Sequence, residues 1–214
     1  MTSRLSKIIM CLCLAAFAFL VAFGNITDYG SNYAFVQHVL SMDTTFPGNA
    51  LMYRSITNPA LWTAGYWLII LGEAITCVLF LIAAWNLWSA RNESGAAFNR
   101  AKKFAIIGTT MGFLVWYFGF MVVGGEWFAM WQSQTWNGQE AAFKFYITML
   151  AVLIYVIQPD ADLDRGLAPA RQRPAGWAKR RRKANIILTF GGEPVSHMAH
   201  RSGAGHRSGR RSTS

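Results

Sequence analysis

Charged residues are scarce in this sequence and unevenly placed. Only 14% of the 214 residues are Asp, Glu, Lys or Arg, whereas 53% are hydrophobic. So little charge, together with long apolar runs, is typical of membrane proteins and atypical of soluble domains. The net charge of +10 would suit a nucleic-acid partner, but twelve of the twenty Lys and Arg residues follow Gln158. The basic charge therefore belongs to one terminal segment, and we expect no nucleic-acid partner.

Histidine and cysteine are also scarce. His38 is the only histidine before residue 197, so the sequence cannot supply two histidines to a haem within a bundle. Cys11, Cys13 and Cys77 form no C-x-x-C pattern, and because all three lie in apolar runs we expect buried thiols. Phosphate-binding glycine loops and nucleophile motifs are absent as well. We therefore expect no metal, no cofactor and no catalytic residue.

What the sequence does contain is a set of long apolar runs. An α-helix rises about 1.5 Å per residue, so about twenty residues cross a hydrocarbon core of roughly 30 Å. The runs cover residues 7–24, 61–87, 104–123 and 142–157. They predict an all-α fold in which residues 1–158 form a four-helix transmembrane bundle within the lipid bilayer.

The first run allows two interpretations. Arg4 and Lys7 precede sixteen apolar residues, 8–23, a layout shared by membrane helices and signal peptides. Small residues at 22 and 24 would suit a peptidase, but the apolar run is long for a signal. We favour an uncleaved helix, and either outcome places Asn25 on the same side of the membrane.

The loops between the runs predict an orientation. Residues 89–103 carry four basic residues and one acidic residue. Segments 25–60 and 124–143 together contain a single Lys or Arg residue, Arg54. Short loops rich in Lys and Arg stay in the cytoplasm. We therefore expect a bacterial inner-membrane protein with both termini cytoplasmic. Residues 159–214 are predicted to be a disordered basic tail that attracts anionic lipid, at about 1 kcal/mol per charge.

The two outer segments are rich in aromatic side chains and predict an extracytoplasmic aromatic cap. Residues 33–42 repeat apolar positions at helical spacing, which indicates a short interfacial helix. His38 and Met42 lie one helical turn apart and could offer Cu(I) an imidazole and a thioether, but two ligands are too few. We interpret His38 as hydrogen-bonded within a folded lid. The candidate functional residues of the cap are Asp28, His38, Asp43, Glu126, Trp127, Trp131 and Trp136.

Glu73 is the only acidic residue in the middle of a predicted span. A carboxyl at that depth costs about 2.5 to 3.5 kcal/mol, so it should face the bundle or a wet cavity. Without a cation at its depth the neutral form is favoured, and we expect it to hydrogen-bond Trp116, Tyr117 or Thr76. The alternative role is a proton relay or a counter-ion for a substrate.

Three glycines in the third span mark a smooth helix face. Gly108 and Gly112 form a small-xxx-small pattern, and Gly119 follows seven residues later. Small residues let a second helix approach closely. We expect packing within the bundle or between copies of the chain.

Five sequence blocks carry a resemblance to a known family: NITDY at 25–29, VQHVLSMD at 36–43, GYW at 65–67, GGEWFAMWQS at 124–133 and WNGQ at 136–139. Through them and Glu73, residues 5–158 resemble a family of small bacterial integral membrane proteins with four predicted spans (domain of unknown function 2165). The resemblance implies topology and carries no activity. The tail after Pro159 departs from the family pattern.

These features favour a non-catalytic accessory or assembly component of a larger membrane complex. The aromatic cap would contact a membrane-protein partner or another copy, since aromatic residues dominate the energetic centres of interfaces. The alternative is a small homo-oligomeric proton-coupled transporter that uses Glu73. Four spans are few for a conduit, so copies would have to associate, for example through the Gly108 face. An enzyme that uses the cap acids is the least favoured class.

Overall fold

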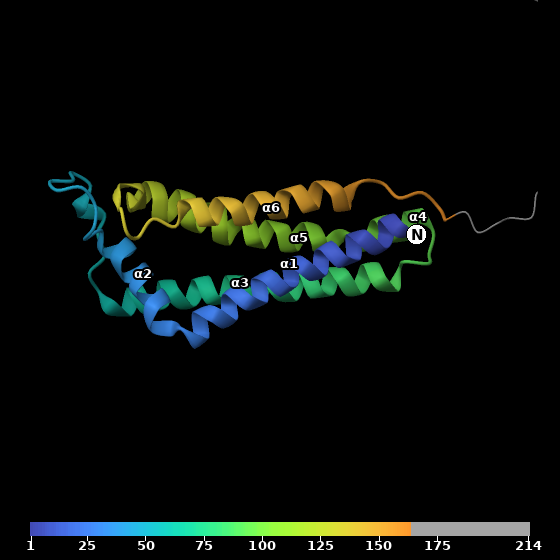
Figure 1. Cartoon of the computed structure of the whole chain (residues 1–214), viewed down its shortest axis with the longest axis horizontal. Helices are drawn as coiled ribbons and strands as arrows, with labels where there is room; N and C mark the ends of the chain where they lie inside the picture. The colour runs from blue at the N-terminus through green and yellow to red at the C-terminus, as the bar shows by residue number, and fades with distance from the viewer. Residues whose placement is uncertain (164–214) are drawn as a thin grey trace, which may run out of the picture. The chain divides into compact units, whose positions relative to one another are not determined.

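The computed structural model describes residues 1–163, whose regular elements are all helices (Figure 1). Four helical stretches in this range are long and apolar enough to cross a membrane. They are α1 (Thr2–Thr27), α3 (Pro59–Ser89), the stretch Gly95–Trp127 and α6 (Gln139–Ile157). They lie side by side as a bundle, which confirms the predicted fold class. Residues 164–214, and with them most of the predicted tail, lie outside the described residues.

The third membrane helix changes geometry along its length. It consists of α4 (Gly95–Ala101), α5 (Lys103–Phe113) and the π-helix η2 (Leu114–Trp127). In a π-helix each amide bonds the carbonyl five residues earlier, and such segments are frequent at functional sites. The amide of Phe128 follows this pattern, since it donates to the Val123 carbonyl over 3.0 Å. The C-terminal half of this helix is therefore wound differently from the N-terminal half.

Local sequence signals explain where α3 and α6 begin. Asn58 is the N-cap of α3, and its side chain accepts a 2.9 Å hydrogen bond from the amide of Ala60. Pro59 occupies the first helical position, where its missing N–H is tolerated. In the first turns of α6, Lys144 pairs with Glu140 at 2.7 Å, as their i,i+4 spacing predicts.

The bundle core is built from small residues where α1 meets α3, and from aromatic rings where η2 meets α1 and α6. Ala15 and Ala18 on α1 are almost fully buried. Trp116 of η2 is buried between Phe17 of α1 and Phe145 of α6, with ring centroids 5.7 and 5.9 Å away. The Trp116 contacts therefore connect α1, the third membrane helix and α6.

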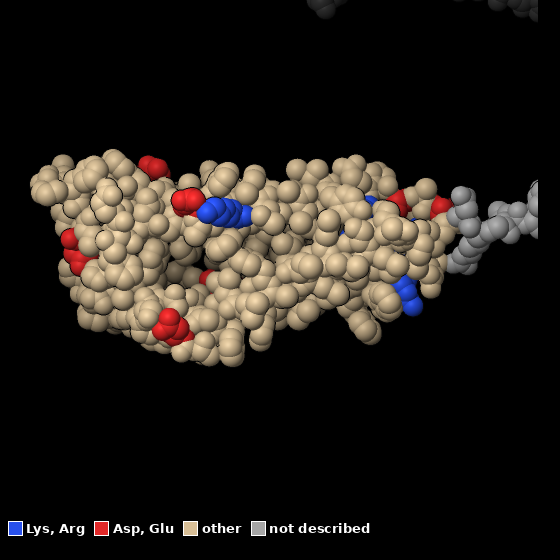
Figure 2. All heavy atoms as spheres, in the orientation of Figure 1, with Lys and Arg blue, Asp and Glu red and all other residues tan. Residues whose placement is uncertain are grey.

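The outer surface of the bundle is apolar. Large hydrophobic side chains are exposed along its length, including Leu68 at 69% and Trp85 at 70%. Figure 2 shows few charged side chains over the middle of this face. Such a surface suits hydrocarbon rather than water.

The prediction that all three cysteines are buried is wrong. Cys13 lies on the exposed side of α1, whereas Cys11 and Cys77 are buried.

The cap covers the end of the bundle next to α2 (Tyr29–Ser41), as Figure 1 shows. It also contains two short 3₁₀ turns, η1 (Met52–Arg54) and η3 (Met130–Gln132). We define the cap as residues 25–58 and 124–139, the two segments from which the sequence predicts it. The N-terminus lies beside α4 at the opposite end of the bundle.

Candidate functional site

Glu73 lies on α3 and is 1% exposed, so its carboxyl faces the inside of the bundle. Asn25, near the end of α1, donates from Nδ2 to Glu73 Oε2 over 2.7 Å. The Tyr66 hydroxyl in turn donates to the Asn25 carbonyl oxygen over 2.7 Å. This network joins α1 to α3, and none of the ion pairs of the described residues involves Glu73.

The predicted partners of Glu73 are wrong. Thr76 donates to the carbonyl of Gly72 on its own helix, and Trp116 packs among aromatic rings. Tyr117 stacks on Phe113. The partner is Asn25, which lies in a stretch whose turn-forming composition indicates a loop although α1 continues to Thr27.

The cap is held together by side-chain amides and hydroxyls. Gln132 Oε1 accepts hydrogen bonds from the Phe46 amide and from Asn49 Nδ2, each 3.1 Å long. The hydroxyls of Thr44 and Ser133 lie 2.8 Å apart. These bonds join the two chain segments of the cap, and they place a buried amide, Gln132, at its centre.

His38 is hydrogen-bonded within the cap, as predicted. Its Nδ1 lies 2.8 Å from Asp43 Oδ2, and its ring stacks on Trp136 with centroids 4.7 Å apart. Met42 is 1% exposed and packs in an apolar cluster, so its thioether is not shared with the imidazole. Among residues 1–163 no three His, Cys, Asp or Glu side chains gather in a way that could hold a metal ion.

The other cap candidates lie at the surface. Trp127 and Trp131 are 52% and 50% exposed. The guanidinium of Arg54 lies 4.6 Å over the Trp127 ring and donates to the Trp127 carbonyl over 3.3 Å. Asp28 and Glu126 are exposed, and the described part of the chain gives neither carboxylate a hydrogen-bonding partner. The acids of the cap therefore do not converge on one site.

The glycines of the third membrane helix have two different surroundings. Gly108 lies against Leu79 and Phe80 of α3, where a Cβ would meet their atoms at 3.4 Å. Gly112 lies against Met149 of α6 and Thr76 of α3. Both therefore pack within the bundle. A Cβ on Gly119 would meet no side chain within 4 Å, because this residue lines an open space.

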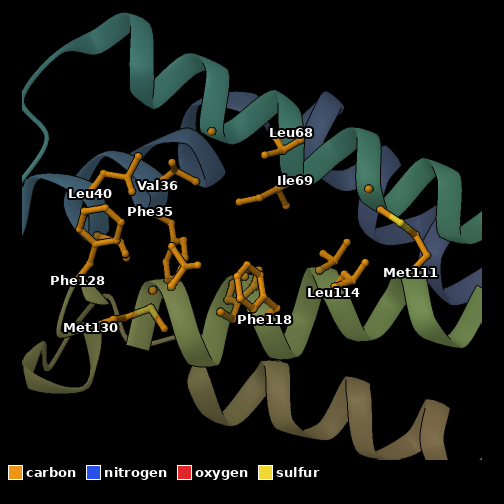
Figure 3. A pocket seen from close by; sticks show the side chains of 18 residues that line it. Phe35, Val36, Leu40, Leu68, Ile69, Met111, Leu114, Phe118, Phe128 and Met130 are labelled. Carbon is orange, nitrogen blue, oxygen red and sulfur yellow. The ribbon is translucent and has the colours of Figure 1, made fainter. Parts of the chain in front are cut away.

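That space is a cavity of about 430 Å³ beneath the cap (Figure 3). Its walls come from α2, α3, α5, η2 and the segment 128–130. Figure 3 shows side chains from opposite walls pointing into it, for example Ile69 and Phe118. Every residue that lines it is apolar or glycine. Glu73 does not line the cavity, although its neighbour Gly72 does.

The cavity arises because α3 packs closely on α5 but only loosely on η2. The sequence gives little warning of it, since the apolar residues that line a cavity resemble those that fill a core. Gly119 was the one available signal, because it continues the glycine pattern of the third span without a packing partner.

A family model described as a predicted small integral membrane protein (DUF2165) matches residues 3–159. The chain belongs to this family. The match confirms the resemblance drawn from the sequence blocks, and it agrees with the four membrane helices. No curated protein and no solved structure matches the chain.

A buried cluster of basic side chains surrounds Asp160, which is one residue beyond the end of the family match. Arg4, Lys7 and Lys102 are each no more than 3% exposed. Both lysine ammonium groups lie 2.6 Å from Asp160 Oδ2, and both donate to the Gln158 carbonyl. The cluster thus connects the start of α1, the third membrane helix and the chain that follows α6.

Arg4 makes the same connection through backbone carbonyls. It donates to the carbonyl oxygens of Arg91, Glu93 and Ala161 over 2.7 to 3.0 Å. Gly95 also contributes, because its amide donates to Asp162 Oδ1 over 2.6 Å. Its bare Cα lets the backbone at 160–161 approach closely.

Sequence reasoning missed this cluster. In the sequence, Arg4 and Lys7 look like charges that flank the first span. Asp160 looks like the start of an acidic stretch in the tail. Burial would raise the pKa of Asp160, but the hydrogen bonds from Lys102 and Lys7 outweigh it and hold the pKa below its ordinary value. The first residues of the predicted tail, 160–162, therefore contact the folded bundle.

Proposed function

We propose that this integral membrane protein is a non-catalytic accessory or assembly component of a larger membrane complex, with the cap as its contact surface. The observation that supports the proposal is a set of exposed aromatic side chains on a cap that is held together by hydrogen bonds. Four large aromatic side chains of the cap and its edge are at least half exposed: Phe46, Tyr53, Trp127 and Trp131. Rings of this kind are the side chains that anchor protein interfaces.

The bracing matters because a preorganised surface loses little entropy on binding. Gln132 and the pair Thr44–Ser133 fix the backbone beneath the rings. Phe46 and Trp131 also meet edge to face, with centroids 5.7 Å apart. The cap therefore offers its aromatic side chains in a defined arrangement.

The position of Glu73 gives less support to the transporter alternative. Its carboxyl is engaged by Asn25 between α1 and α3, and it does not line the apolar cavity. A hydrophobic cargo in that cavity would not touch the group that has to exchange protons. The carboxyl is placed as a link between two helices.

The cellular placement is part of the same proposal. The basic loop at 89–103 favours a cytoplasmic location for the α4 end, with the cap outside a bacterial inner membrane. Binding of anionic lipid by the basic tail stays a prediction, because that segment lies outside the described residues.

Gentle detergent extraction of the full chain, followed by identification of the proteins that accompany it, tests the accessory role. We expect a defined larger membrane complex. The double variant Tyr53→Ser, Trp131→Ser should release the partner while the helix content of the bundle is unchanged. Trp85→Ser is the matched control, because Trp85 is exposed on α3 away from the cap.

Recovery of only a monomer or a symmetric oligomer from native membranes would contradict the accessory role. The transporter alternative has its own measurement, proton-coupled flux in vesicles. Loss of flux in Glu73→Gln, with insertion retained, would support transport instead.

A further inference from the structure

We propose that the cavity beneath the cap binds one acyl chain of a bilayer phospholipid, which enters sideways between α3 and η2. This proposal does not depend on the accessory role. It rests on the composition, the size and the opening of the cavity.

The composition of the cavity excludes polar occupants. All eighteen lining residues are apolar or glycine, so water inside would find no hydrogen-bonding side chain. A polar headgroup would be equally unpaired there. Left empty, the walls would lose the dispersion contacts that a close-packed interior provides. A hydrocarbon chain satisfies these walls without needing a polar partner.

The size of the cavity favours a thin occupant over a helix from a second copy. Its volume of about 430 Å³ falls in the usual range of small-molecule sites. A helix with its side chains is about 10 to 12 Å in diameter. The end of the cavity next to the cap is lined by α2 with Phe128 and Met130, which leaves a helix no way through. An acyl chain is much narrower than a helix, so it needs less room between these walls.

The opening of the cavity faces the lipid-exposed side of the bundle. Three of its lining residues, Leu68, Leu114 and Phe118, are 69%, 52% and 52% exposed. Figure 3 places Leu68 on α3 opposite Phe118 and Leu114 on the facing helix. Other lining residues are shielded, with Val39 at 8% and Met130 at 2% exposure. A chain that enters between α3 and η2 therefore passes from exposed to buried walls.

The distinction between exposed and buried walls supplies the experiment. The full chain is reconstituted in phosphatidylcholine vesicles that contain phosphatidylcholine with a photoreactive diazirine on one acyl chain. After illumination, the labelled residues are located by mass spectrometry. We expect label on Val39 and Met130, which bulk lipid does not reach, in addition to outward positions such as Leu71.

Filling the cavity should remove the inner label. In Gly119→Leu the new side chain occupies the space of the acyl chain, and label at Val39 and Met130 should fall about tenfold. Gly24→Leu is the matched control, because a Cβ there, like one on Gly119, meets no side chain within 4 Å, and Gly24 does not line the cavity. Leu114→Trp narrows the opening from a second position and should lower the inner label as well.

The proposal is overturned if the wild-type chain is labelled only at outward positions, a result that needs no variant. It is also overturned if Gly119→Leu folds and leaves the inner label unchanged. An isoprenoid lipid retained by the purified protein in place of phospholipid would assign the cavity to a different occupant. So would a dimer that Gly119→Leu abolishes.

Discussion

Asn25 Nδ2 donates a hydrogen bond of 2.7 Å to Glu73 Oε2, so the end of α1 is bonded to α3 at its single membrane carboxyl. The bond resolves a problem that the sequence poses, because a carboxyl in hydrocarbon is costly without a polar partner. The backbone carbonyl of Asn25 accepts a hydrogen bond from the Tyr66 hydroxyl, so the Asn25 side chain remains available to donate to Glu73.

The first prediction concerns this bond. Asn25→Leu should lower the free energy of unfolding by about 1 to 3 kcal/mol, because it leaves the buried carboxyl without its amide donor. Glu73→Gln should cost less, since a carboxamide oxygen still accepts from Asn25. Thermal unfolding in detergent, followed by circular dichroism, measures both. The double variant Asn25→Leu, Glu73→Leu should lose less than the sum of its single variants, and strict additivity would show that the two side chains are not coupled.

The second prediction concerns the bracing of the cap. Gln132→Leu removes the acceptor that holds the Phe46 amide and Asn49, so the loop that carries Phe46 should open more often. Hydrogen exchange of amides 44–52 should become faster, with little change in the helices of the bundle. Gln134→Leu is the control, because Gln134 is exposed. Equal protection in both variants would mean that Gln132 does not brace the loop.

The third prediction concerns the charge at the other end of the bundle. Asp160→Asn leaves the buried ammonium groups of Lys7 and Lys102 without their carboxylate, and should cost up to about 3 kcal/mol. The amide oxygen of the new Asn can take the place of Asp160 Oδ2 as a hydrogen-bond acceptor for both ammonium groups, so the loss reports mainly on charge. Unfolding of both proteins in detergent at neutral pH measures the difference.

The pKa of Asp160 gives this difference a pH dependence. The folded-state pKa lies below the ordinary value of about 3.9, so the carboxylate stabilises the fold fully above that pH. Its contribution is lost as the pH falls from about 3.9 through the lower folded-state pKa. The stability gap between wild type and Asp160→Asn should therefore narrow in acid. A gap that widens below pH 4 would contradict the assignment.

The sequence predicts the bundle well because span length and apolar composition are local properties. Four long apolar runs suffice for four helices, and an i,i+4 spacing suffices for the pair Glu140–Lys144. Partners distant in the chain were not predictable in this way. Asn25 meets Glu73 across 48 residues, and Asp160 meets Lys7 across 153, so only the packing of whole helices brings them together.

The cap could be predicted in part from the sequence, whereas the cavity could not. The aromatic content of the cap is visible in its composition, but the buried amide of Gln132 at its centre is not. The cavity depends on the loose packing of η2 against α3, along the part of the third membrane helix where the winding changes, and no residue pattern predicts that change. Gly119 alone pointed to it.

The last prediction locates the end of the folded unit. A chain truncated after Leu163 keeps Asp160, the Ala161 carbonyl and Asp162, so it should unfold at the temperature of the full chain. A chain truncated after Pro159 loses all three, and with them acceptors of Lys7, Lys102, Arg4 and the Gly95 amide. Removal of one side of a buried charge pair costs about 3 to 5 kcal/mol, so this shorter chain should unfold at a clearly lower temperature. Faster hydrogen exchange at the start of α1 should accompany the loss of stability, because the hydrogen bonds from Arg4 and Lys7 to residues 160–161 are gone. Equal stability of the two truncated chains would show that residues 160–162 do not belong to the folded unit.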